Sequence, residues 1–218
     1  MLAHLVADFI LQPGWLVRYK RVPAGRAVHA GIHGLVMLLL AAPVLPRWWL
    51  AIPTVTVLHF LVDGMKAEWA PERGPISLAA FLFDQAVHIG ILLIGALVAG
   101  LSLDSDVTYR SPAVTGALYY ALPYVAATFG GAILVYQVAV AFATRPTPLD
   151  LLSPPVRALG MAERAFTLTI LLFLPPVWWW VGAITTALHV GATSGRRARW
   201  PEGVSGVILT VALGLVFR

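Results

Sequence analysis

Apolar runs and short polar stretches alternate along the chain, and this pattern predicts how the chain folds. Continuous apolar runs of roughly 18 or more residues are typical of membrane-spanning helices. We expect such helices at residues 28–45, 50–65, 77–101 and 113–142. Because the runs do not alternate residue by residue, the pattern favours helices over a transmembrane β-barrel.

Two of the apolar segments depart from a simple span. Residues 1–11 are apolar, but at about 1.5 Å per residue they cross only about half of a hydrocarbon core. The 113–142 segment contains Pro123 and the pair Gly130-Gly131, which predict a kinked or broken helix.

The C-terminal part has shorter apolar segments. Residues 165–193 are too long for one span and too short for two, so we expect a broken hairpin that turns near Pro175-Pro176. A last short segment follows at 204–217. The predicted fold is all-α, a polytopic transmembrane helical bundle of about six to seven segments. We divide it into a four-segment part at 1–101 and the remaining segments at 102–218, within one membrane domain.

Composition and charge agree with this picture. The 218 residues are 59% hydrophobic and 11% charged, whereas soluble domains carry about 25% charged residues. The loop at 13–27 has four basic residues and no acid, which predicts that it lies in the cytoplasm. Net charge +5, spread between apolar runs, indicates lipid partners, including anionic headgroups, rather than nucleic acid.

Four of the apolar segments carry pairs of metal-binding residue types at spacing i, i+4. This spacing puts both side chains of a pair on one helix face. The pairs are His4 and Asp8, His29 and His33, His59 and Asp63, and Asp84 and His88. With the 13–27 loop in the cytoplasm, all four pairs fall in the cytoplasmic half of the membrane.

Shared depth suggests that the pairs meet in one polar site. Each lone aspartate at membrane depth costs roughly 2.5–3.5 kcal/mol, so the aspartates should face one another or a cation. A single histidine is well explained by a hydrogen bond between helices, and we assign His189 such a structural role. The set of four pairs instead favours a functional site, and the absence of cysteine limits its ligands to imidazole and carboxylate.

The residues around these pairs resemble a known family. The motifs are His4-x-x-x-Asp8-Phe9-x-x-Gln12, His29-x-x-x-His33, His59-Phe60-x-x-Asp63-x-x-Lys66 and Asp84-Gln85-x-x-His88. Over residues 4–88 they resemble the bacterial membrane family called domain of unknown function 3307 (DUF3307). The resemblance implies a multi-pass protein of the bacterial cytoplasmic (inner) membrane and says little about activity. By analogy alone, the pattern is also similar to membrane-embedded metal hydrolases that use His and Asp from several helices.

We interpret the site as a divalent metal centre, with zinc as the default ion and iron or manganese as alternatives. The predicted ligands are His4, His29, His33, His59, Asp63 and His88. Asp8 is expected to act as a ligand or as a general base towards water at the metal, and Asp84 to complete a second metal position or orient the ligands. Gln12, Lys66 and Gln85 are expected to contact substrate or to support the ligands.

The function favoured by this site is metal-dependent hydrolysis of a lipid or lipid-linked substrate at the cytoplasmic side. Two other interpretations stay open. The same residues could form a proton or cation relay in a transporter, or the chain could be a non-catalytic subunit that binds haem through paired histidines.

Overall fold

The computed structural model describes residues 1–69, 75–102, 109, 111–142, 154–182, 184–185 and 200–218. The described part is helical and contains no strand, which confirms the all-α prediction. Four of its helices are long and apolar enough to cross a membrane, namely Pro23–Leu40, Trp48–Lys66, Pro75–Val98 and Pro112–Phe142, and a shorter apolar helix covers Val204–Phe217. The protein is therefore an all-α bundle of membrane helices.

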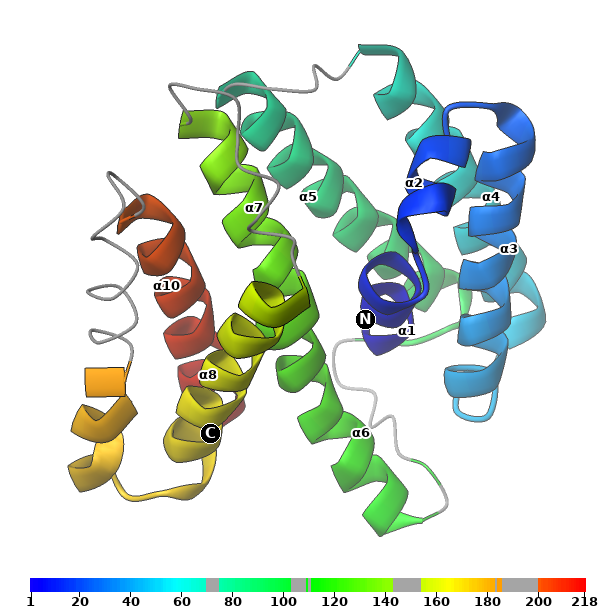
Figure 1. Ribbon diagram of the computed structural model, residues 1–218. Helices are drawn as coiled ribbons and strands as arrows, with labels where there is room; N and C mark the ends of the chain where they lie inside the picture. Colours follow the sequence, from blue (N-terminus) through cyan, green and yellow to red (C-terminus); the bar gives the residue numbers. More distant parts are fainter. Residues whose placement is uncertain (70–74, 103–108, 110, 143–153, 183, 186–199) are drawn as a thin grey trace. The chain divides into compact units, whose positions relative to one another are not determined.

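Contacts within the chain divide it into two compact units (Figure 1). The N-terminal unit comprises Met1–Glu72 and Ala79–Tyr119, and the C-terminal unit comprises Arg73–Leu78 and Tyr120–Arg218. All the predicted site residues belong to the N-terminal unit. This division does not test the domain boundary predicted after residue 101, which stays a prediction.

The N-terminal unit is built around α3 (Pro23–Leu40) and α4 (Trp48–Trp69), which pack along each other. The short helices α1 (Leu2–Leu5) and α2 (Gly14–Tyr19) also pack against α3 (Figure 1). Small residues allow close contact between the long helices. A Cβ atom on Gly34 of α3 would lie 2.9 Å from Thr56 Oγ1 of α4, and one on Gly95 of α5 (Pro75–Val98) would meet the Val55 side chain.

The first apolar segment is short, as predicted. Helix α1 continues into a π-helical turn, η1 (Val6–Ile10), and the helix ends before Pro13. Its small side chains Ala3 and Ala7 are buried in an apolar cluster with residues of α3, α4 and α5. This packing holds the His4 and Asp8 side chains against the three longer helices.

The C-terminal unit contains the predicted interruption. A π-helical turn, η2 (Ala126–Gly130), separates α6 (Pro112–Val125) from α7 (Gly131–Phe142). The side chain of Arg164, on α8 (Pro154–Phe173), donates from Nε to the Ala127 carbonyl at 2.7 Å and from an Nη to the Thr128 carbonyl at 3.3 Å. These bonds satisfy carbonyl groups of the π-helical turn.

The rest of the C-terminal unit packs around the same elements. Helix α10 (Trp200–Phe217) packs against α7 and α8. Helix α8 ends at Phe173, and the 3₁₀ turn η4 (Pro176–Trp178) follows directly, so the chain turns at the predicted Pro175-Pro176. The second half of the predicted hairpin, with His189, lies largely outside the described residues.

Several helices begin earlier than the apolar runs predict. Helices α3, α5, α6 and α8 all start at a proline, and α8 starts eleven residues before the apolar segment predicted at 165–193. Proline suits the first helical position because its missing N–H would have no partner there. The loop predicted at 13–27 also contains helix α2 and the first turns of α3.

Candidate metal centre

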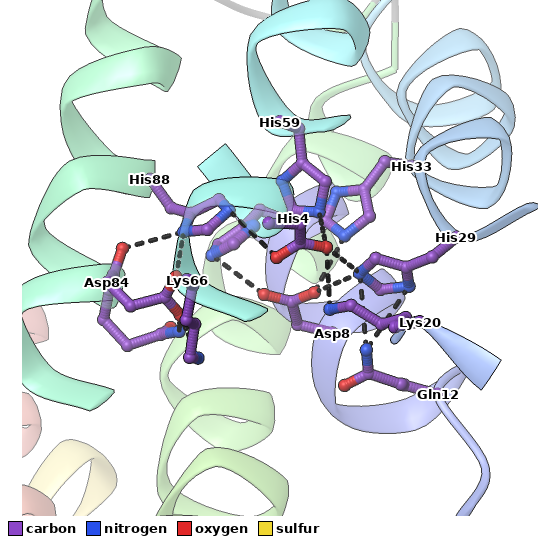
Figure 2. Close-up of polar contacts among 12 residues, drawn as sticks. His4, Asp8, Gln12, Lys20, His29, His33, His59, Lys66, Asp84 and His88 are labelled. Atoms are coloured by element: carbon purple, nitrogen blue, oxygen red, sulfur yellow. Dashed lines mark hydrogen bonds and ion pairs between the residues drawn. The ribbon is translucent and has the colours of Figure 1, made fainter. Parts of the chain in front are cut away.

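The four i, i+4 pairs meet inside the N-terminal unit (Figure 2). They come from α1 and η1, from α3, from α4 and from α5, so the site joins four separate segments. The five histidines of the pairs are between 0% and 3% exposed, and Asp63 and Asp84 are also buried. Convergence of the pairs was the main structural prediction, and the geometry agrees with it. The chemical roles of the residues stay predictions.

Asp8 is the centre of one half of the cluster. His29 Nε2 and His33 Nε2 each lie 2.9 Å from Asp8 Oδ1, and His4 Nε2 lies 3.5 Å from Asp8 Oδ2. One ligand atom each from Asp8, His29, His33 and His59 lie within 4.8 Å of one another. Two ligands of one zinc ion, each about 2.0–2.2 Å from the metal, are themselves separated by roughly 3 Å, so these distances suit a metal position.

Asp63 is the centre of the other half. His59 Nε2 lies 3.5 Å from Asp63 Oδ2, and His88 Nε2 lies 4.0 Å from Asp63 Oδ1. His59, Asp63 and His88 form a second group whose ligand atoms lie within 4.8 Å of one another. The two halves adjoin, because His29 Nε2 is 3.7 Å from Asp63 Oδ2 and the rings of His33 and His59 have centroids 3.7 Å apart.

The protonation of His88 can be inferred from its partners. Its Nδ1 lies 2.7 Å from the backbone carbonyl oxygen of Asp84, which can only accept a hydrogen bond. In the neutral ring Nδ1 therefore carries the proton, and Nε2 presents a lone pair towards the Asp63 carboxylate. Histidines that bind metals commonly donate their other ring N–H to a backbone carbonyl in this way.

Several buried polar atoms of the cluster have no hydrogen-bond partner. Seven buried side-chain atoms in the described part of the chain are unsatisfied, and four belong to the cluster: His59 Nε2, Asp63 Oδ2, Asp84 Oδ1 and His88 Nε2. Asp63 Oδ2 does contact the Lys20 ammonium, but without hydrogen-bond geometry. All four atoms are ligand types, so a bound cation would satisfy atoms that make no hydrogen bond within the described part of the protein.

Two lysines extend the cluster. Lys66 Nζ lies 2.7 Å from Asp84 Oδ2, and Lys20 Nζ lies 2.7 Å from Asp63 Oδ2. Lys66 belongs to the predicted set, but Lys20 does not, because in the sequence it is only one of four bases in the 13–27 loop. Helix α2 brings it to the site, and no residue spacing in the sequence signals that contact.

The two predicted glutamines lie at the edge of the cluster. Gln85 Nε2 donates to Asp84 Oδ2 at 3.2 Å. The orientation of the Gln12 amide that satisfies both its ends accepts from Lys20 Nζ at 2.8 Å and donates to the Asp8 backbone carbonyl at 3.1 Å. Figure 2 draws the opposite orientation, with the amide nitrogen 3.4 Å from His29 Nε2.

The comparisons with known proteins identify a family. The family model described as "Protein of unknown function (DUF3307)" matches residues 1–114. The chain belongs to the DUF3307 family. The match contains all the cluster residues, from His4 to His88, whereas most of the C-terminal unit lies beyond it. No curated protein and no solved structure matches the chain. The DUF3307 description carries no activity, so the function has to be argued from the site.

Proposed function

We propose that this DUF3307 protein is a metal-dependent membrane hydrolase whose centre is the His/Asp cluster of the N-terminal unit. The observation that supports a bound metal ion is the hydrogen bonding of His88. Its Nδ1–H donates to the Asp84 carbonyl oxygen. In the neutral ring the Nε2 lone pair therefore faces the Asp63 carboxylate with no proton between them. Two acceptors that face each other in a buried site favour a cation between them, either a metal ion or a second proton on the imidazole, and the excess of carboxylates in the cluster favours the metal ion.

A cluster held only by hydrogen bonds explains the site less well. Such clusters between membrane helices typically use Ser, Thr, Asn and Gln, which cost less to bury than carboxylates. Here three aspartates face two lysines, so the carboxylates exceed the ammonium groups. A divalent ion would offset the excess negative charge and would keep the imidazoles neutral.

The donors divide into two sets of equal composition. Since His59 Nε2 has one lone pair, it can serve only one metal ion. We assign it to a set with Asp63 and His88, which leaves Asp8, His29 and His33 as the other set. Each set then has two imidazoles and one carboxylate, and three protein ligands with an open position are typical of catalytic metal sites. Zinc, iron and manganese all suit this ligand set.

Two predicted residues then take roles beside the metal positions. His4 lies outside both sets, with its Nε2 3.5 Å from Asp8 Oδ2 and its ring stacked on that of His88 at 5.2 Å. We assign His4 the role of general base, which accepts a proton from the attacking water. Asp84 orients His88 through its backbone carbonyl and holds Lys66 through its carboxylate.

The metal ions, when bound, would supply Lewis-acid activation of water and of an ester oxygen. In the proposed reaction, water oxygen forms a bond to the ester centre, the ester C–O or P–O bond breaks, and the alcohol leaves with a proton. The long apolar helices support a lipid or lipid-linked substrate. The basic 13–27 loop supports a site at the cytoplasmic side of a bacterial inner membrane.

One observation favours a second candidate, a proton or cation relay. The pairs Lys20–Asp63 and Lys66–Asp84 join the histidines into a continuous group of ionisable side chains, which is typical of relays in transporters. Haem binding gains no such support, because the imidazole rings of His33 and His59 lie against each other.

Metal analysis tests the proposal. Protein purified without chelator and incubated with zinc, iron or manganese is expected to hold between one and two equivalents of one ion. Retention of less than about a tenth of an equivalent of each would contradict the metal centre, since so many ligands should hold an ion. Incubation of the loaded protein with extracted membrane lipids should release a hydrolysis product, detected by mass spectrometry, that the His59→Ala variant does not release. Ion flux in vesicles without such a product would favour the relay.

The membrane arrangement can be tested separately. The chain has no cysteine, so single cysteines introduced at Tyr19 and Ser102 report only their own position. They are expected to react with an impermeant thiol reagent from opposite sides of the membrane. Reaction of both from one side would contradict the topology and the cytoplasmic position of the site.

A further inference from the structure

We infer that the substrate carries a phosphoryl group and that Lys20 and Lys66 bind it. This inference rests on the proposed function and adds the chemical class of the substrate. The starting observation is the position of the two ammonium groups. Each lies 2.7 Å from a carboxylate of the cluster, Lys20 at Asp63 and Lys66 at Asp84.

The lysines are the accessible part of the cluster. Their side chains are 21% and 33% exposed, whereas the histidines around them are at most 3% exposed. Figure 2 shows Lys20 at the Gln12 side of the cluster and Lys66 at the Asp84 side. A molecule that approaches the metal ligands past either of these exposed side chains therefore meets an ammonium group before it meets a histidine.

Charge indicates what kind of molecule the loaded site would accept. Three carboxylates and two ammonium groups leave one excess negative charge. One divalent ion makes the centre singly positive, and two make it triply positive. A positive centre among apolar helices requires a compensating anion, because an uncompensated charge at membrane depth is costly.

Metal binding would also release one of the lysines. A metal ion that takes Asp63 as a ligand would replace Lys20 as its counter-charge and so release Lys20, whereas Lys66 keeps its bond to Asp84 and offers its remaining N–H groups. Lysine has a flexible stem and a compact charge, so its ammonium can move to an anion nearby. Gln12 keeps Lys20 at the site during this exchange, because its amide oxygen also accepts from Lys20 Nζ at 2.8 Å.

A phosphoryl group fits these cations better than a carboxylate does. It offers three peripheral oxygens, enough for two ammonium groups and a metal ion together, whereas a carboxylate offers two. The chain segment that ends in Lys20 also suits a membrane surface. Helix α2 exposes Trp15 and Tyr19, and exposed aromatic side chains are typical of the headgroup region. The phosphoryl group could belong to a lipid headgroup or to a soluble molecule, and the test separates the two.

The test measures binding to the zinc-loaded protein in detergent by titration calorimetry. The probes are dihexanoyl phosphatidic acid, inorganic phosphate and dihexanoyl glycerol, which lacks the phosphoryl group. We expect wild-type protein to bind the phosphatidic acid and not the glycerol lipid. The Lys20→Met/Lys66→Met variant should bind the phosphatidic acid about tenfold or more weakly while it holds at least as much zinc. Arg18→Met, which removes an exposed base from the same helix, is the matched control and should bind as wild type does.

The outcomes separate the possible failures. Equal affinity for inorganic phosphate would assign the site to a soluble phosphoryl compound, and much tighter binding of the phosphatidic acid would assign it to a lipid. Zinc-loaded protein that binds neither phosphoryl probe, or whose binding does not depend on the lysines, would overturn this inference alone. Protein that holds no metal would overturn the proposed function as well. If the double variant does not fold, the single variants Lys20→Gln and Lys66→Gln are measured instead. Each is expected to bind the phosphatidic acid about threefold or more weakly than wild type.

Discussion

The two units of this protein satisfy the charges of their buried and half-buried side chains in different ways. In the C-terminal unit Arg164 reaches two backbone carbonyls of the π-helical turn, so its charge is satisfied by the chain itself. In the N-terminal unit three aspartates and five histidines lie together, and four of their polar atoms have no hydrogen-bond partner. A buried charge by itself thus says little about function. Buried ligand atoms that the protein leaves unsatisfied are the evidence for a bound ion.

Removing a metal ligand should have the largest effect on metal content and on stability. Replacing Asp63 by Ala removes the carboxylate that contacts His59, His88 and Lys20. We expect bound metal to fall by about one equivalent, because Asp63 is the one carboxylate of its ligand set. The Tm should fall as well, because ligation also contributes folding free energy. A loss of about 3 kcal/mol corresponds to a fall in Tm of roughly 6–12 °C. His33→Ala should act in the same direction, and metal analysis with thermal unfolding measures both effects.

The control for these variants is His189→Ala, which removes the sequence's one histidine outside residues 4–88. It should change neither metal content nor Tm by much. If the ligand variants lowered the Tm but kept the metal, the cluster would be structural.

Removing Arg164 should destabilise the C-terminal unit without touching the metal. Arg164→Met leaves the Ala127 and Thr128 carbonyls without these donors. The expected loss is about 2 kcal/mol, or a fall in Tm of roughly 4–8 °C. Arg157→Met, on the same helix, removes only a cation–π contact with Phe129 and should cost less. Loss of metal from Arg164→Met would show that the two units do not behave independently.

A smaller effect is expected from the residue that supports a ligand. Asp84→Asn keeps the backbone carbonyl that accepts from His88 but removes the charge that holds Lys66. Metal affinity should fall about tenfold, as is typical for partners of metal ligands. Competition with a fluorescent chelator measures it. Gln85→Ala, next in the chain and also in contact with Asp84, should change the affinity much less.

The smallest effect should have the opposite sign. Lys66→Met removes a cation that competes with the metal for the Asp84 side of the cluster. Because Lys66 is one-third exposed, its ion pair is weak, and the metal affinity should rise only about threefold, or ~0.7 kcal/mol. Lys66→Arg keeps the charge and should leave the affinity unchanged. A fall in affinity on Lys66→Met would mean that the lysine supports the metal ligands rather than competing with the ion.

The sequence predicts the cluster well because helical spacing and membrane depth together restrict where the pairs can lie. His59 with Asp63 and Asp84 with His88 each share a helix face, and the cost of a buried charge requires these faces to meet. The short first helix and the interruption near Gly130 follow from chain length and from residues that disturb helices.

The helix ends and Lys20 are the features that the sequence predicts poorly. Apolar runs mark the part of a helix inside the membrane, but α3 starts at Pro23, five residues before its apolar run. The proline is the better signal for the start, because it fits the first helical turn whatever the polarity of its neighbours. Lys20 contacts Asp63 through the fold of helix α2, a tertiary contact between residues 43 positions apart, and no local pattern encodes it.

The short first helix has a consequence for the order of synthesis. His4 and Asp8 leave the ribosome first of the cluster, but the ring of His4 stacks on that of His88, which is 84 residues later in the chain. At roughly 5–20 residues per second, these partners are made about 4–17 s apart. The aspartate of an unfinished chain must wait that long for α4 and α5 to enter the bilayer. Capture of the proposed ion would therefore be a late step of insertion, and a cell depleted of metal should then accumulate full-length protein whose first helix is open to proteases.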